Sequence, residues 1–256
     1  MIFQSSKDIK KFRASNGLLG EVLAKVRAAV APGVTTLQLD QLAEKTIRDA
    51  GGTPGFKGYG AAWGAPPFPG TLCTSLNDVI VHGVPSNQPL EEGDILSVDC
   101  GAVLKGFHSD AAFTIEVGQS TERAQRLIEA SKRSLWAGIE KARAGNHIGD
   151  ISAAIYAVVR SYGFDVARNL WGHGIGRNLH EPPDVRNYGV AGTGPKIEEG
   201  LAIAIETMVC EKSHVLVTDQ HDGWSVKTAD GGMTSHYEHT VLITANGPEP
   251  LTLFED

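Results

Sequence analysis

The sequence has few cysteines and no long apolar run. Its 256 residues include only three cysteines, Cys73, Cys100 and Cys210, and no Cys-x-x-Cys pair. A disulfide framework or a zinc ribbon is therefore not indicated, and we expect reduced thiols in a cytoplasmic protein. The chain has neither the roughly 18 consecutive apolar residues that a membrane span needs nor the apolar core of a signal peptide near its start.

Positive charge is also scarce. The chain has 23 Lys and Arg against 30 Asp and Glu, a net charge of −7, and no Lys/Arg-rich run. This balance excludes nucleic acid and anionic membranes as partners attracted by overall charge. A hydrophobic content of 41% with 21% charged residues is typical of a globular protein, and the length is sufficient for a sizeable core.

The spacing of apolar residues predicts the same order of helices and strands twice. The predicted helices cover 6–30, 35–50, 120–144 and 150–161, with Ser120 and Asp150 as caps of the last two. The predicted strands cover 71–75, 79–84, 94–104, 107–117, 201–209, 224–227 and 236–244. Residues 52–70 are rich in Gly, Pro and aromatics and predict a long loop. We therefore expect one α+β domain over 1–256 with related halves, about 1–120 and 121–256.

Two acidic residues occur in the third and fourth predicted strands. Asp99 lies in an otherwise apolar strand, and Asp110 follows a turn expected at Lys105 and Gly106. With that turn Gly101 faces Asp110, so Asp99 lies on the same face as the diagonal neighbour of Asp110, about 7–8 Å away between backbones. The two charges would repel each other there. Burial would raise the pKa of at least one carboxyl group unless a cation lies between them.

The second half supplies further metal-binding residue types. Glu206 and Glu238 are acids in strand-like contexts, and the glycine-rich segment 172–182 contains His173 and His180. This segment matches neither a dinucleotide fingerprint nor H-E-x-x-H, and the chain has no G-x-S-x-G elbow or Walker loop. Two Asp, one His and two Glu remain, and these five residues are suited to a pair of divalent metals.

These motifs, in this order, resemble those of type I methionine aminopeptidases nearly end to end. The matching segments are 77–83, 98–99, 108–110, 172–176, 180–182, 205–206 and 237–240. The resemblance implies the pseudo-symmetric pita-bread fold, in which helices lie outside a curved antiparallel sheet that holds two metals. It also implies removal of N-terminal methionine from nascent polypeptides whose second residue is small, by a monomer that meets its substrates at the ribosome.

The resemblance further assigns the metal ligands by position. Asp99 would bind one metal, His173 and Glu206 mainly the other, and Asp110 and Glu238 would bridge both. Carboxylates and imidazoles accept Co, Mn, Fe or Zn, so the ligand types leave the metal open. The pair of cations would lower the pKa of a bridging water, and the resulting hydroxide would attack the first peptide carbonyl.

Substrate contacts follow from the same resemblance. Glu206 would transfer protons, His180 would stabilise the tetrahedral oxyanion, and His82 would contact the nitrogen side of the scissile bond. The methionine side chain would enter an apolar pocket. Its expected lining is Tyr59, Phe68, Cys73 and Trp224, with Trp63 as a candidate replacement for Tyr59 or Phe68.

Three positions depart from the family pattern. Leu179 stands where a bulkier aromatic residue is expected and Thr207 where proline is usual, and both would reshape the pocket mouth. His236 stands where the family often has glutamine. It shares a strand face with Glu238, so we expect it to hydrogen-bond a metal-site carboxylate or the bridging hydroxide and thereby orient a ligand. His239 should point to the opposite face.

Two other functions are compatible with the fold. A proline-specific peptidase such as aminopeptidase P or prolidase has similar ligands but usually an additional N-terminal domain, whereas Asp99 here follows only 98 residues. A catalytically inactive pita-bread binding protein typically loses metal ligands, and all five are present in this sequence. Hydrolysis of Met-Ala-Ser and Ala-Pro peptides, compared with and without metal, would separate the three functions.

Overall fold

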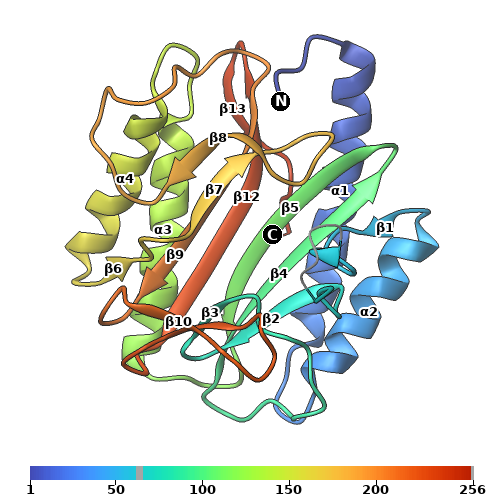
Figure 1. The fold of residues 1–256 in the computed structure, drawn as a ribbon, viewed down its shortest axis with the longest axis vertical. Helices are drawn as coiled ribbons and strands as arrows, with labels where there is room; N and C mark the ends of the chain where they lie inside the picture. The colour runs from blue at the N-terminus through green and yellow to red at the C-terminus, as the bar shows by residue number, and fades with distance from the viewer. Residues whose placement is uncertain (62–65, 255–256) are drawn as a thin grey trace.

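The computed structural model describes residues 1–61 and 66–254, and the helices of this part lie outside a curved sheet (Figure 1). The helices are α1 (Ser6–Ala29), α2 (Thr36–Asp49), α3 (Glu122–Lys141) and α4 (Ile148–Ser161). Among the described residues, none of these helices is long and apolar enough to cross a membrane. The spacing of apolar residues in the sequence predicted all four helices in the correct order.

Two predicted helix caps are wrong. The Ser120 hydroxyl donates to the Glu116 carboxylate at 2.7 Å, and Thr121 caps α3 instead by accepting a backbone N–H of the first turn at 3.2 Å. Asp150 lies inside the first turn of α4, where its carboxylate accepts the backbone N–H of His147 at 2.7 Å. An acid in a first turn and a cap residue stabilise the same helix end, and the sequence pattern alone does not separate them.

The strands form one large and one small sheet within the described residues. The large sheet contains β1 (Thr53–Pro54), β2 (Leu72–Leu76), β4 (Ile95–Leu104), β5 (Phe107–Glu116), β6 (Asp165–Val166), β7 (Trp171–Gly174), β8 (Glu181–Arg186), β9 (Ala202–Cys210), β12 (Thr234–Thr244) and β13 (Gly247–Pro250). The small sheet contains β3 (Val79–Val81), β10 (Leu216–Thr218) and β11 (Val226–Thr228).

The order of the large sheet places the two halves of the chain side by side. Its path is β1-β4-β5-β12-β9-β7-β8, so that β5 of the first half pairs with β12 of the second at the centre. Helices α1 and α2 lie behind the first-half strands, and α3 and α4 behind the second-half strands (Figure 1). This arrangement confirms the expected α+β class and the two-part layout of a pita-bread fold.

The hairpin between β4 and β5 has the predicted register. Lys105 and Gly106 have φ angles of 54° and 79°, both in the left-handed region that a two-residue type I′ turn requires. Gly101 consequently pairs with Asp110. The side chains of Asp99 and Asp110 therefore project from the same face of the sheet.

Strands β7 and β8 were not predicted, because their sequence is rich in glycine and proline. The glycines permit close approach of neighbouring backbones: a Cβ on Gly172 would lie 2.3 Å from the Ala204 carbonyl oxygen, and one on Gly174 would lie 2.1 Å from that of Pro182. Such contacts exclude any side chain at both positions. Packing therefore selects residues with low strand propensity here.

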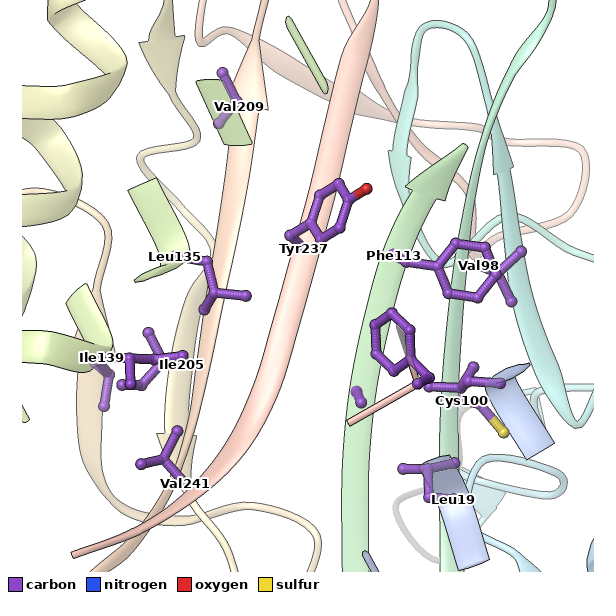
Figure 2. Close-up of a cluster of buried hydrophobic side chains, with 14 of the residues drawn as sticks. Leu19, Val98, Cys100, Phe113, Leu135, Ile139, Ile205, Val209, Tyr237 and Val241 are labelled. Atoms are coloured by element: carbon purple, nitrogen blue, oxygen red, sulfur yellow. The ribbon is translucent and has the colours of Figure 1, made fainter. Parts of the chain in front are cut away.

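Alternation along the central strands separates an apolar core from the opposite face of the sheet. Val98, Phe113 and Ile205 are fully buried and point toward the helices, where they belong to one cluster with Leu19 of α1 and Leu135 of α3 (Figure 2). The intervening residues of the same strands face the other way. The core thus fixes which residues reach the concave face.

We predict that Leu135→Ala lowers the free energy of unfolding by about 2–5 kcal/mol, because it leaves a cavity between α3 and the sheet. Urea unfolding monitored by circular dichroism would measure the change. Val190→Ala is the control: Val190 is 69% exposed, and its truncation should change stability by no more than about 0.5 kcal/mol. Equal effects of the two substitutions would contradict this description of the core.

Candidate metal centre

Three of the acidic residues lie in one row across the sheet. Asp99 pairs with Ala112, Ala112 pairs with Glu238, and Glu238 pairs directly with Glu206. Opposite residues in antiparallel strands have Cβ atoms about 4.5–5.5 Å apart. Glu206 and Glu238 are therefore direct neighbours, and the small side chain of Ala112 leaves space between Asp99 and Glu238.

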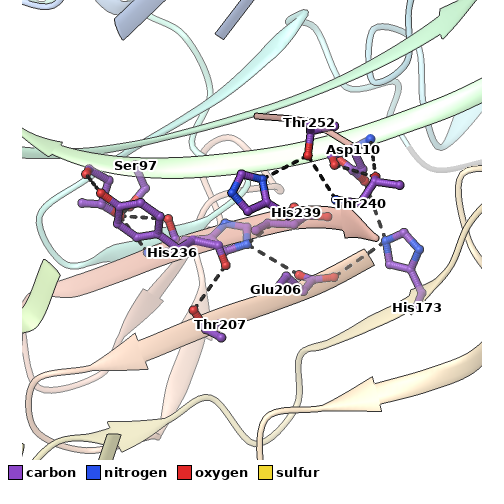
Figure 3. A network of polar contacts seen from close by, with 12 residues as sticks. Ser97, Asp110, His173, Glu206, Thr207, His236, His239, Thr240 and Thr252 are labelled. Carbon is purple, nitrogen blue, oxygen red and sulfur yellow. Dashed lines mark hydrogen bonds and ion pairs between the residues drawn. The ribbon is translucent and has the colours of Figure 1, made fainter. Parts of the chain in front are cut away.

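The adjacent row of paired residues contains the fourth acid, Asp110, and the imidazole of His173. The Thr240 hydroxyl donates to the Asp110 carbonyl oxygen at 2.8 Å and accepts the Asp110 N–H at 3.2 Å, which fixes β5 against β12. Thr240 pairs with Ala204, and Ala204 pairs with His173. Asp110 and His173 therefore lie at the two ends of this row, on the same face of the sheet, with Thr240 and Ala204 between them (Figure 3).

The four carboxyl groups are crowded and poorly solvated. Burial raises the pKa of Asp99 to about 7. Burial, and then the negative charge of Asp99, raise the pKa of Asp110 and of Glu206 well above the usual range of carboxyl groups. Burial, followed by the charges of Asp110 and Glu206, does the same to the pKa of Glu238. All four groups are ionised together near neutral pH only if positive charge lies among them.

His173 is held in the form that suits a ligand. Its Nδ1 lies 2.8 Å from the Gly174 carbonyl oxygen, so Nδ1–H donates there and Nε2 carries the free lone pair. Nε2 lies 3.7 Å from an oxygen of Asp110 and 3.7 Å from an oxygen of Glu206. Burial lowers the pKa of His173 to about 3, so the ring is neutral near neutral pH.

The donor set fits a pair of divalent cations. Asp99 Oδ1, Asp110 Oδ1, Glu238 Oε1 and His236 Nε2 are buried and have no hydrogen-bond partner within the described part of the chain, although buried polar atoms are normally paired. Two groups of donors each bring one atom per residue within 4.8 Å of one another. They are Asp110, His173 and Glu238, and Glu206, His236 and Glu238.

An apolar pocket opens onto this cluster. It has a volume of about 520 Å³, within the roughly 300–1,000 Å³ of small-molecule sites. Its lining includes every described residue expected from the sequence: Tyr59, Phe68, Cys73, His82, Asp99, Asp110, His173, His180, Glu206, Trp224, His236 and Glu238. Trp63, the candidate replacement, lies outside the described residues.

The aromatic wall, His82 and His180 are held by specific contacts. The rings of Phe68 and Trp224 meet edge to face with centroids 5.3 Å apart. The ring centroids of His82 and Trp224 are 6.2 Å apart. His82 has a φ of 60°, a strained value for a residue other than glycine. Such strain is typical of side chains that a site holds in a required direction. Tyr59 Oη lies 2.5 Å from Nδ1 of His180.

The structure also shows where the atypical residues lie. Leu179 lines the pocket, as expected. The expectation that Thr207 reshapes the pocket mouth is wrong, because Thr207 faces α3 and its hydroxyl lies 3.1 Å from the Ser131 carbonyl oxygen. His239 also faces the helices, as predicted, where its Nδ1 lies 3.1 Å from the Thr252 hydroxyl (Figure 3).

The sequence did not identify several pocket residues. Met208 lines the pocket two residues beyond Glu206, so strand alternation would have placed it there. Trp171 and Asp184 line its mouth from β7 and β8. No signal was available for these two residues, because the strands that carry them were not predicted.

Comparisons with known proteins identify the family of this chain. The model of metallopeptidase family M24 matches residues 10–245, and the chain belongs to this family. It is 45% identical over 256 residues to a methionine aminopeptidase of Clostridium acetobutylicum, with 100% of both chains covered. It is 46% identical over the same length to one of Clostridium perfringens, again with 100% of both chains covered.

Solved structures show the same relationship. The methionine aminopeptidase of Rickettsia prowazekii superposes with a TM-score of 0.94 at 35% identity, covering 99% of this chain and 100% of that one. The prolidase of Pyrococcus horikoshii superposes with a TM-score of 0.79 at 22% identity, and the match covers 99% of this chain but only 64% of the prolidase chain. The second likeness is one of fold alone, so identity favours the methionine-specific branch over the proline-specific one.

Asp110→Asn should have opposite effects with and without metal. In chelator at pH 8 the variant should melt at a higher temperature than the unmodified protein. A carboxyl group whose pKa is raised by folding destabilises the folded state above its ordinary pKa, and the neutral amide removes that cost. Saturating Mn²⁺ should raise the melting temperature of the variant by less than that of the unmodified protein. Metal at a hundredfold excess over Kd stabilises the unmodified protein by about 2.7 kcal/mol per site. Differential scanning calorimetry in both buffers measures this. An unchanged metal response would contradict the placement of Asp110 in the cluster.

Proposed function

We propose that this chain is a metalloaminopeptidase that removes N-terminal methionine from polypeptides. The observation that carries the proposal is the cluster of acids and imidazoles at the base of an apolar pocket. Such a site combines hydrolytic metal chemistry with recognition of an apolar side chain. The activity is that of the relatives matched over their full length.

Five residues would hold the two cations: Asp99, Asp110, His173, Glu206 and Glu238. The orphaned oxygens of Asp99, Asp110 and Glu238 and the free Nε2 lone pair of His173 support this assignment. When bound, the cations would lower the pKa of a water molecule and polarise the scissile carbonyl. We infer that the whole chain, 1–256, acts as a single catalytic domain, because both halves contribute ligands to this cluster.

His180 would stabilise negative charge on the substrate. Its Nδ1 lies 2.5 Å from the Tyr59 hydroxyl. We assign the Tyr59 O–H as the donor to Nδ1, which places the proton of the neutral ring on Nε2. Burial lowers the pKa of His180, which keeps the ring neutral near neutral pH. Nε2–H is then available to the oxygen of the tetrahedral intermediate.

Glu206 and His82 would complete the catalytic set. The carboxylate of Glu206 lies at the base of the pocket and would accept a proton and return it to the leaving amine. His82 lines the pocket beside Trp224 and would contact the nitrogen side of the scissile bond. Burial lowers the pKa of His82 to about 4, so it too is neutral at neutral pH.

The pocket chemistry suits a methionine side chain. Phe68 and Trp224 present aromatic edges and faces, and a thioether gains about 0.3–1.5 kcal/mol from such contacts. Burial raises the pKa of Cys73 well above that of a free thiol. Cys73 is therefore a small polarisable wall and has no nucleophilic thiolate at neutral pH.

The substrates would be nascent polypeptides with a small second residue. By resemblance to its family, the chain would act in the cytoplasm at the ribosome and as a monomer. The metal would be Co, Mn, Fe or Zn, which these ligands all accept.

Peptide specificity tests the proposal directly. Met-Ala-Ser, Met-Gly and Met-Ser peptides should be cleaved in the presence of divalent metal, and Met-Lys, Met-Trp and Ala-Pro peptides should not. Chelation should abolish the activity, and added metal should restore it. Chromatographic detection of released methionine measures each rate. Preferential hydrolysis of Ala-Pro would favour a proline-specific peptidase, and metal binding without hydrolysis would favour an inactive binding protein.

The role of His180 can be tested separately. His180→Ala should lower kcat by about 10²–10³-fold with little change in KM, the loss expected when an oxyanion donor is removed. Tyr59→Phe should lower kcat less, because it removes only the hydrogen bond that fixes the tautomer. Steady-state kinetics over pH 6–9 would measure both. A rise in KM alone would instead assign His180 to substrate binding.

A further inference from the structure

His236 lies inside the carboxylate cluster. It stands on β12 two residues before Glu238 and is only 2% exposed. Its Nε2 lies 3.7 Å from Oε2 of Glu206 (Figure 3). The same nitrogen lies 3.8 Å from Oε2 of Glu238. The ring therefore points at two of the carboxylates assigned above to the metal centre.

The position of this ring is fixed by the backbone. The Thr114 hydroxyl accepts the His236 N–H at 2.8 Å and donates to the His236 carbonyl oxygen at 3.0 Å. This bidentate contact ties β12 to β5 at the level of the ring. The direction of the imidazole is thus set by the sheet itself and not by a flexible loop.

Hydrogen bonds to the carboxylates do not account for the ring. An N–H donor lies about 2.7–3.2 Å from its acceptor, whereas both oxygens are at least 3.7 Å from Nε2. Nε2 has no other hydrogen-bond partner among the described residues. A buried ring nitrogen without a partner is costly.

The spacing fits a shared cation instead. Two donors that each lie about 2.0–2.2 Å from one transition metal are at most about 4.4 Å apart, and both separations fall below this limit. His173 shows the same spacing to the cluster, 3.7 Å from Oε1 of Glu206 and 3.7 Å from Asp110. Glu206 is therefore flanked by one imidazole at each of its two oxygens.

We propose that His236 is a direct metal ligand, whose Nε2 binds one cation together with Glu206 and Glu238, while His173 binds the other together with Asp110 and Glu238. Glu206, which the resemblance places mainly with the cation of His173, would then also hold the cation of His236, so that each of the two cations has an imidazole of its own. This inference rests on the proposed function, since it assumes the two-cation centre. It goes beyond the expectation from sequence, in which His236 only orients a ligand through a hydrogen bond. It also increases the number of protein ligands from five to six.

A second imidazole changes the chemistry of the centre. Neutral nitrogen ligands suit Zn, Fe, Co and Ni better than Mg or Ca, which prefer oxygen. The ligand set of this chain therefore favours transition metals at both positions. His236→Gln should shift the preference toward Mn²⁺, because an amide oxygen replaces the nitrogen.

Nuclear magnetic resonance of the cadmium-loaded full chain tests direct binding. Protein labelled with ¹⁵N in its histidine rings is loaded with ¹¹³Cd²⁺, and one-bond ¹¹³Cd–¹⁵N couplings count the bound imidazole nitrogens. We expect two coupled nitrogens in the unmodified protein and one in His236→Gln. His239→Gln is the matched control, because His239 is the neighbouring buried histidine that faces the helices, and it should keep two.

Affinity measurements add a second readout. Isothermal titration with Zn²⁺ should show that His236→Ala weakens one of two sites by more than the roughly 10–100-fold that is typical of a partner that does not touch the metal. A single coupled nitrogen in the unmodified protein would overturn the inference, even if the variant fails to fold.

The outcomes for the inference and for the proposed function are distinct. A single coupled nitrogen, together with metal-dependent methionine release by the same preparation, would reject His236 as a ligand and leave the function intact. Two coupled nitrogens without methionine release would support the ligand and contradict the function. Absence of any coupling or bound cadmium would reject both the ligand and the metal centre.

Discussion

Repulsion among four buried carboxyl groups is the constraint on which the site depends. Glu206 and Glu238 pair directly across two strands, and Asp99 lies in the same row beyond a single alanine. Like charges opposite each other destabilise a sheet, so this row opposes folding unless protons or cations neutralise it. The same repulsion thus explains why the site favours cations and why the sheet is less stable without them.

The rest of the fold offsets that cost. The same strands that present acids on the concave face present Val98, Phe113 and Ile205 to the helices, and these side chains are fully buried. Burial of each such side chain contributes about 1.5–3 kcal/mol. Because one face supplies stability, the other can carry charged groups that the fold alone would not favour.

Much of this arrangement was readable from the sequence because strand alternation and a two-residue turn are local rules. The turn at Lys105 and Gly106 fixed the register that places Asp99 near Asp110. The set of five acidic and imidazole residues was singled out by residue type and context, whereas the role of each at the two metals came from resemblance to a family and stays a prediction. Strands β7 and β8 were beyond the sequence, since close backbone approach decides them. The facing of Thr207 was within reach, because alternation from Glu206 along the predicted strand places it on the helix side, where it contacts Ser131.

The pocket and the cluster are also joined by a line of rings. Tyr59 hydrogen-bonds His180, and the His180 ring lies against that of His173 with centroids 4.3 Å apart. Tyr59 belongs to the apolar wall that a substrate side chain would touch, whereas His173 faces the carboxylates. A side chain that displaces Tyr59 therefore removes the hydrogen bond between Tyr59 and His180. If His180 stabilises the oxyanion as proposed, recognition of the substrate side chain and orientation of the His180 ring both depend on Tyr59.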